Sequence, residues 1–302
     1  MKNRIFLLLI VLLQAVSSFS QSVLESPGKK LRAEINVGKQ NVAIALYTSG
    51  QKLLDVKTLQ FELDKEIVQG EWILKKQTED EVRSSWQPLY GENSRINDCY
   101  NSLALQLSSS VNNKDMIVDV RLYDEGLAFR YSFDELDFWN RVLLKENTEF
   151  VFGSDCTTWA TERAQSAFYE TSLRQLEGSL DRPQIVKIGS EKYVAIGEAA
   201  LVDYSRMKLK KDENGIGLLS DLSGEVHLDL ADYKSPWRYV MVGNNPGEFV
   251  QNNYFVLNLN EPNQIECTDW IKPGDVIREV TLTTQGGLAC VDFAAANGIE
   301  YV

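Results

Sequence analysis

The sequence has 302 residues, enough for about two domains or for one large β domain and part of another. With 44% hydrophobic and 25% charged residues, its composition is that of a globular protein and excludes a disordered or collagen-like chain. The net charge of -12, without an offsetting basic stripe, excludes nucleic acid as a partner. The single histidine, His227, excludes a multi-histidine zinc site.

The N-terminus predicts a secretory signal peptide. Lys2 and Arg4 precede the apolar run Ile5–Leu13, which is too short to span a bilayer. Small residues then predict cleavage before Gln21. We therefore expect a signal peptide over residues 1–20, export to the periplasm and no membrane span.

From Lys30 to about Leu259 the hydrophobic pattern has a period of two, which predicts strands. The clearest hairpin has strands over 118–122 and 127–133, joined by a turn at 124–126. Further strands are expected over 193–196, 226–230, 237–241 and 255–259, with His227 exposed on a polar face. More than a dozen short strands with polar turns predict antiparallel sheets packed face to face.

Two intervals break this rhythm. Residues 155–182 are aromatic and polar without a period, so we interpret them as a long surface excursion that can include a helical turn. In the tail, 276–282 has strand composition, 284–287 opens an apolar helix over 288–296, and 299–302 resembles another strand. Strand, helix and strand in this order predict the opening of a parallel α/β domain.

Six segments carry a resemblance to a known family; they are Ser85–Glu92, Arg121–Tyr131, Gly197–Tyr204, Ser235–Arg238, Leu257–Pro262 and Trp270–Gly274. Taken in this order, they resemble the N-terminal region of glycoside hydrolase family 97, which comprises exported α-glucosidases and α-galactosidases. The resemblance covers essentially the whole mature chain. It implies a mainly β fold, an antiparallel β-supersandwich of the galactose-mutarotase-like kind, followed by the truncated start of a catalytic (β/α)8 barrel.

The resemblance also sets the expected domains and activity. Residues 21–272 would form the sandwich, and residues 273–302 a linker and the first βαβ stub of the barrel. The two carboxylates that hydrolyse the glycosidic bond in this family lie on barrel strands and loops beyond the position of Val302. We therefore expect no catalytic residue in this chain and no activity from it alone.

The family binds calcium through several barrel glutamates and one glutamate of the N-terminal domain. The segment Gly197–Tyr204 resembles the part that supplies this glutamate, which assigns Glu198 as the metal ligand. Calcium needs six to eight oxygen ligands, so the ion would bind weakly or not at all without the barrel. Asp203 would either support Glu198 or cap a turn.

Four residues are candidates for contact with an oligosaccharide substrate, because they combine flat apolar faces with hydrogen-bonding groups; packing of a core or loop explains them equally well. They are Trp86, Tyr90, Glu92 and Arg95.

The expected function is that of the non-catalytic N-terminal part of a family 97 α-glycosidase, which supports the barrel and donates a calcium ligand. The alternative is a stand-alone carbohydrate-binding β-sandwich. A mutarotase-like enzyme is disfavoured, since it needs histidine acid–base chemistry and the chain has one histidine. Sugar specificity, stereochemical outcome and oligomeric state do not follow from the sequence.

Overall fold

The computed structural model describes residues 20–213, 216–229 and 233–302, so the expected signal peptide lies outside the described residues except for Ser20. Two compact units are present: one holds the residues up to Val82 together with Cys99–Leu259, and the other holds Arg83–Asp98 and Asn260–Val302. None of the helices in the described part of the chain is both long and apolar enough to cross a membrane.

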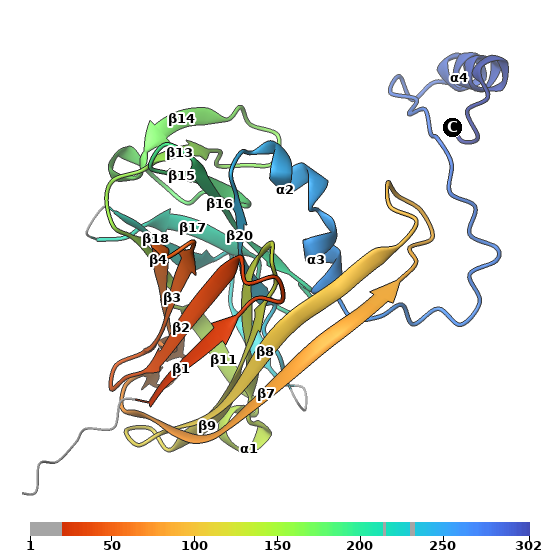
Figure 1. Cartoon of the computed structure of the whole chain (residues 1–302). Coiled ribbons are helices and arrows are strands. Elements are labelled where there is room, and N and C mark those ends of the chain that lie inside the picture. Colours follow the sequence, from red (N-terminus) through yellow and green to blue (C-terminus); the bar gives the residue numbers. More distant parts are fainter. Residues whose placement is uncertain (1–19, 214–215, 230–232) are drawn as a thin grey trace, which may run out of the picture. The chain divides into compact units, whose positions relative to one another are not determined.

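The fold consists of three sheets of antiparallel strand pairs (Figure 1). The seven-stranded sheet contains, in spatial order, β1 (Ser20–Glu25), β2 (Leu31–Val37), β3 (Val42–Thr48), β4 (Gln51–Thr58), β12 (Glu149–Phe152), β18 (Gly217–Leu222) and β17 (Met207–Lys211). The nine-stranded sheet contains β14 (Tyr169–Ser172), β13 (Thr157–Ala160), β15 (Gln184–Ile188), β16 (Lys192–Ala199), β20 (Trp237–Gly243), β10 (Gly126–Phe133), β9 (Lys114–Leu122), β8 (Ile96–Ser109) and β7 (Trp72–Trp86). The four-stranded sheet contains β19 (Val226–Leu228), β11 (Arg141–Glu146), β5 (Phe61–Leu63) and β6 (Ile67–Val68).

Short helices accompany the sheets. They are α1 (Glu135–Phe138), the 3-10 turn η1 (Leu173–Gln175), α2 (Gly247–Gln251), α3 (Tyr254–Asn258) and α4 (Thr284–Asn297).

One continuous apolar core joins the inner faces of the three sheets in the described part of the chain. Phe129 of β10 lies 6.5 Å, between ring centroids, from Phe150 of β12, and Tyr131 lies 5.1 Å from Phe61 of β5. Aromatic rings of the nine-stranded sheet thus contact both other sheets. The predicted mainly β sandwich of face-to-face antiparallel sheets is confirmed.

The hairpin of β9 and β10 is the part of the fold that the alternation predicted best. Val120 and Leu122 are fully buried and pair with Phe129 and Leu127. On the far side of β10, Gly126 packs so closely against β20 that an added Cβ would lie 2.5 Å from the carbonyl oxygen of Val240. This glycine is required for contact between strands.

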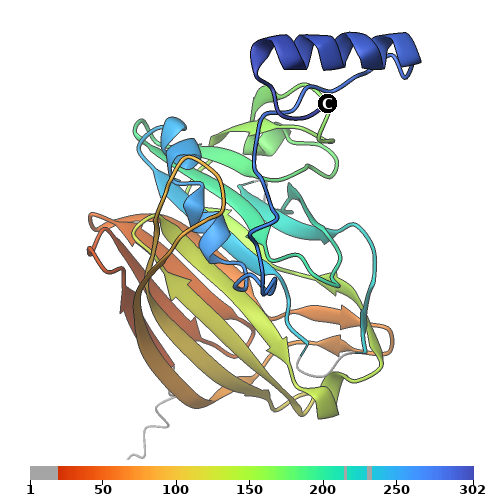
Figure 2. The same ribbon diagram turned by 90° about the vertical axis from the view of Figure 1, so that its right-hand side faces the viewer.

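A second apolar cluster covers the outer face of the nine-stranded sheet, where α3 lies across it (Figure 2). Our prediction of a strand over 255–259 is wrong, because this segment contains α3. Phe255 and Leu259 are buried at helical spacing, whereas Leu257 between them is 47% exposed. The alternating apolar residues imitated a strand because both periods fit so short a run.

The expected surface excursion over 155–182 is wrong where the interval forms β13 and β14, which pair with each other. The helical turn expected as an option there is present as η1. The strands give no alternating hydrophobic pattern in this aromatic and polar segment. The reason is that β14 lies at the sheet edge, where its two faces do not differ sharply in burial.

The tail contains the expected helix but not the expected strands. Helix α4 begins after Thr283, whose side chain accepts a hydrogen bond from the N–H of Gly286, and ends at Gly298, which has φ +69°. The predicted strand over 276–282 is reduced to one parallel bridge between Val276 and Tyr301. Strand composition alone does not form a strand without a continuous partner.

Candidate functional site

A fully buried arginine links the nine-stranded sheet to the four-stranded sheet. Arg238 of β20 donates from Nε and Nη2 to the carboxylate oxygens of Glu146 at 2.9 and 2.7 Å, and from Nη1 to Glu198 at 2.5 Å. Burial is the largest single influence on the pKa of Arg238 and lowers it. The charge and hydrogen bonds of Glu146, together with the charges of Tyr204 and Glu198, outweigh burial and raise the pKa above its ordinary value. Arg238 therefore stays charged, and both carboxylates compensate it.

Glu198 continues the inward face of β16. It stands opposite Arg238 in the β16–β20 pair, and its side chain is 2% exposed. Its second oxygen lies 2.6 Å from Nε of Arg182, and both oxygens accept from the N–H of Met207 at 3.2 and 3.1 Å. Glu198 is therefore a buried and fully bonded carboxylate.

The ion pairs continue from Glu198 toward the surface. Arg182 donates from Nη1 to Asp181 at 3.1 Å, and the second oxygen of Asp181 lies 3.7 Å from Arg206. Arg206 is 44% exposed at the side chain, so this end of the network reaches solvent. We call the six residues the buried charge network; they are Glu146, Arg238, Glu198, Arg182, Asp181 and Arg206. Three carboxylates balance three guanidinium groups, as burial of charge requires.

Tyr204 joins the buried charge network to a surface hollow. Its hydroxyl donates to Glu146 at 3.1 Å, and Arg238 lies 5.5 Å from the centre of its ring. Burial, with the charge of Glu146, raises the pKa of Tyr204 well above its ordinary value. The hydroxyl therefore remains a neutral donor, and the ring is held in place.

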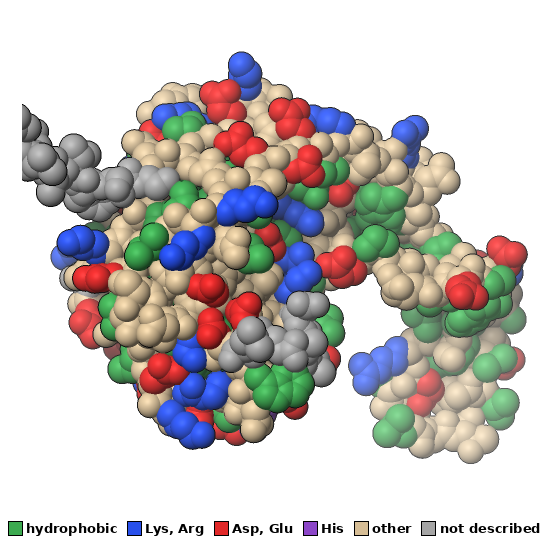
Figure 3. Space-filling view, turned by 90° about the horizontal axis from the view of Figure 1, so that it is seen from below, with side chains coloured by type: hydrophobic (Ala, Val, Ile, Leu, Met, Phe, Trp, Pro, Cys, Tyr) green, Lys and Arg blue, Asp and Glu red, His purple; other side chains and the backbone are tan. Residues whose placement is uncertain are grey.

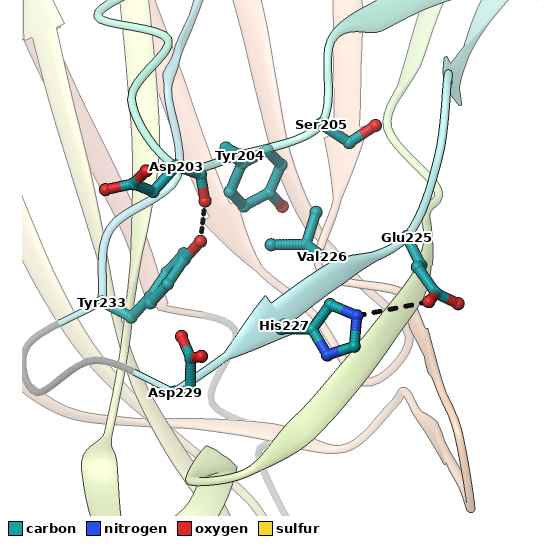
Figure 4. Close-up of a pocket in the computed structure, with 8 residues that line it drawn as sticks. All are labelled: Asp203, Tyr204, Ser205, Glu225, Val226, His227, Asp229 and Tyr233. Atoms are coloured by element: carbon teal, nitrogen blue, oxygen red, sulfur yellow. Dashed lines mark hydrogen bonds and ion pairs between the residues drawn. The ribbon is translucent and has the colours of Figure 1, made fainter.

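This hollow is a pocket of about 520 Å³ in the sandwich unit (Figure 4). Its lining consists of Asp203, Tyr204 and Ser205 from the segment between β16 and β17, Glu225, Val226 and His227 at β19, and Asp229 and Tyr233 beyond β19. The hydroxyl of Tyr233 donates to the carbonyl oxygen of Asp203, and His227 Nε2 lies 3.2 Å from Glu225. The first bond ties Tyr233 to the 203–205 segment, and the second links Glu225 and His227 on the other side of the pocket.

The surroundings of Glu198 do not fit a calcium ion as they stand. Two guanidinium groups and one N–H occupy its oxygens, and a nearby cation disfavours a second one. Within the described residues, no group of three or more His, Cys, Asp or Glu side chains is placed to hold a metal. The assignment of Glu198 as a calcium ligand stays a prediction.

The four residues proposed for substrate contact lie at the tip of the β7–β8 hairpin, in the smaller unit. Tyr90 is 76% exposed and Trp86 is 38% exposed, and Glu92 is exposed as well. Arg95 donates from Nε and Nη2 to the hydroxyl of Ser85 at 2.8 and 2.6 Å. The structure brings these residues onto one hairpin, and their role in sugar binding stays a prediction.

Several residues of the site were not anticipated. The pairing of Glu146 with Arg238 carries no local signal, because the two residues are 92 apart in sequence and meet only through the fold. The acidic wall of the pocket could have been predicted, since Glu225, His227 and Asp229 alternate and therefore lie on one face of a strand. His227 is exposed as predicted, with 64% of its side chain accessible.

Three antiparallel sheets around one core, with a charged network between them, define a β-sandwich domain in the described part of the chain. A family model described as "Glycosyl-hydrolase 97 N-terminal" matches residues 24–262. The chain belongs to this family.

Individual relatives agree with this assignment. A retaining α-galactosidase of Bacteroides thetaiotaomicron is 26% identical over 365 aligned residues, covering 100% of this chain and 52% of the relative. A family 97 enzyme of Pseudoalteromonas sp., solved in complex with panose, superimposes with a TM-score of 0.83 at 22% identity, covering 92% of this chain and 46% of its own. A β-arabinopyranosidase superimposes with a TM-score of 0.77 at 17% identity, covering 93% and 50%. The chain therefore spans about half the length of the proteins it matches.

Proposed function

We propose that this chain is the non-catalytic N-terminal part of a family 97 α-glycosidase that hydrolyses α-galactosides or α-glucosides. The observation that carries the proposal is the family match over residues 24–262. The relative from Bacteroides, a retaining α-galactosidase, extends over about twice the length that this chain covers. In this proposal the sandwich supports a barrel that contains the reacting carboxylates.

The bonding of the buried carboxylates supports a non-catalytic role. Glycoside hydrolysis uses a pair of carboxyl groups that flank the bond and exchange protons with it. Glu146 and Glu198 are bonded to Arg238 and nearly inaccessible, at 1% and 2% side-chain exposure. Neither is free to approach a glycosidic oxygen.

An assay with a complementing half tests the proposal. We expect the chain alone to release no nitrophenol from nitrophenyl α-galactoside or α-glucoside. Joined to the second half of the Bacteroides relative, it should restore hydrolysis that this second half lacks by itself. Turnover by the chain alone would contradict the non-catalytic role. Sugar binding without any restoration would favour the stand-alone binding module.

We also propose that Glu198 contributes to a calcium site in the longer protein. The resemblance of Gly197–Tyr204 supports this proposal, whereas the contacts with Arg182 and Arg238 oppose it in the chain as described. An ion at Glu198 would have to displace a guanidinium group and take its other oxygens from outside the chain.

Calorimetry on the joined protein separates calcium binding from ion pairing. Glu198→Gln should weaken calcium binding by about tenfold or more, because it removes a charged ligand. Arg182→Gln breaks the same ion pair from the other side and should leave calcium affinity unchanged or tighter. Equal losses in both variants would show that Glu198 acts only through the network. The chain alone should bind calcium at about 1 mM or more weakly.

A further inference from the structure

We propose that the pocket beneath the 203–205 segment binds a neutral saccharide of one or two pyranose rings. The assignment of a sugar rests on the proposed function, whereas the pocket is built entirely by residues of the sandwich unit. Its volume, about 520 Å³, lies within the range of about 300–1,000 Å³ typical of small-molecule sites.

The walls have two different characters, as a sugar requires. In Figure 4, Tyr204 and Tyr233 stand on one side of the hollow, and Glu225 and His227 stand on the opposite side. The Tyr204 and Tyr233 rings lie 6.4 Å apart, between centroids, tilted by 45°. Aromatic carbon pairs with the C–H surface of a sugar ring, while the polar wall meets its hydroxyl groups.

The polar wall selects for hydroxyl donors. The carboxylates of Glu225 and Asp229 accept hydrogen bonds, and His227 has one ring nitrogen beyond the one paired with Glu225. None of the eight described lining residues is Lys or Arg, so the lining offers no cation to a phosphate or a uronic acid. A neutral, hydroxyl-rich ligand fits this wall.

The aromatic wall is fixed before any ligand arrives. Tyr204 is bonded to Glu146, which Arg238 holds through two hydrogen bonds. Tyr233 is 6% exposed and bonded to the backbone of Asp203. A preformed wall lowers the entropy lost on binding and makes a small ligand detectable.

Saturation-transfer NMR titration of the chain with methyl α-galactoside and with maltose tests the proposal. We expect a Kd of about 1 mM for at least one sugar, in line with the modest affinity available per ligand atom. Asp229→Ala should weaken binding by about tenfold, the usual effect of a lost charge-assisted hydrogen bond. Glu191→Ala, an exposed change in the β15–β16 turn outside the lining, should leave it unchanged.

The dependence of binding on salt concentration distinguishes a neutral sugar from a cationic ligand. Binding of a neutral saccharide should not change between 20 and 500 mM NaCl, whereas an ammonium ligand such as ethanolamine would lose affinity. The proposal is overturned if no sugar binds at 50 mM, if Asp229→Ala binds like the parent, or if only the ammonium compound binds. Restored hydrolysis without sugar binding here would refute this site and leave the proposed function standing.

Discussion

Arg238 compensates two carboxylates that are almost fully buried, those of Glu146 and Glu198. Arg238→Met should cost about 3–5 kcal/mol in the free energy of unfolding, because Glu146 and Glu198 would stay buried beside an apolar side chain. Arg206→Ala, at the exposed end of the network, should cost at most about 1 kcal/mol. Urea unfolding of both variants measures the difference. Equal effects would mean that the buried charge network contributes nothing beyond surface pairing.

At the residue scale, the sequence identified a candidate functional carboxylate but did not predict its ion-pair partners. The resemblance pointed to Glu198, just beyond the strand predicted over 193–196. In the structure β16 extends to Ala199 and places Glu198 on the inner face with Val194 and Ile196. Its partner Arg238 lies 40 residues away, and strand register decides the pairing. A single sequence carries the period of each strand but not the register between strands.

At the element scale, the sequence pattern places Gly126 in a turn, whereas the structure shows that the close approach of β10 and β20 requires a glycine there. Gly126→Ala should destabilise the fold by about 2–3 kcal/mol, because the new Cβ would collide with the backbone of β20 at Val240. Gly153→Ala is the matched control, since its Cβ would meet no atom within 4 Å and should change stability by less than about 1 kcal/mol. Thermal unfolding of both variants shows whether Gly126 is needed for the packing of β10 on β20 or only for the turn. Similar stabilities would refute the close packing of β10 on β20.

Helix α3 offers a direct test between a helix and the strand that the alternation predicted. Phe255→Ala should cost about 3–5 kcal/mol, since Phe255 is fully buried against Tyr123 and Tyr239. Leu257→Ala should cost less than about 1 kcal/mol, because Leu257 is 47% exposed. In a strand both side chains would share one face and both changes would be costly. Chemical denaturation of the two variants gives the answer.

The clearest correct prediction, β9, has long alternation with a contrast in burial between its faces. The failure over 255–259 is a short segment, in which a helical turn and a strand place apolar residues equally well. The central strand β20 was predicted correctly over 237–241, although six of its seven residues are buried and apolar clusters cover both of its faces.

At the scale of the whole molecule, acidic and basic side chains on the surface are mixed and do not form a patch of one sign on the face shown in Figure 3. The net charge is -12, and on the face shown in Figure 3 acidic and basic side chains are interspersed. Such a surface favours neutral ligands over polyanions, in keeping with a saccharide. The larger unit contains the apolar cores, the buried charge network and the pocket, all within residues that the family match covers.

The smaller unit, by contrast, leaves apolar side chains in solvent. In α4 only Ala294 is buried, while Leu288, Val291 and Phe293 are 63%, 51% and 54% exposed. An isolated helix of 14 residues is marginally stable in water, so its amides should exchange through frequent local opening. We expect α4 to exchange at least about a hundredfold faster than β9, which is paired on both sides.

Hydrogen exchange read by mass spectrometry measures this ratio directly. The comparison also has an internal control, because the edge strand β14, exposed but paired with β13, should fall between α4 and β9. Joining the second half of the Bacteroides relative should slow α4 selectively, since an added apolar surface would cover Leu288 and Phe293. Exchange of α4 as slow as that of β9 in the chain alone would show that its apolar face is already covered, for example by a second copy of the chain. A concentration series would then separate a dimer, whose protection rises with concentration, from a monomer, whose protection does not.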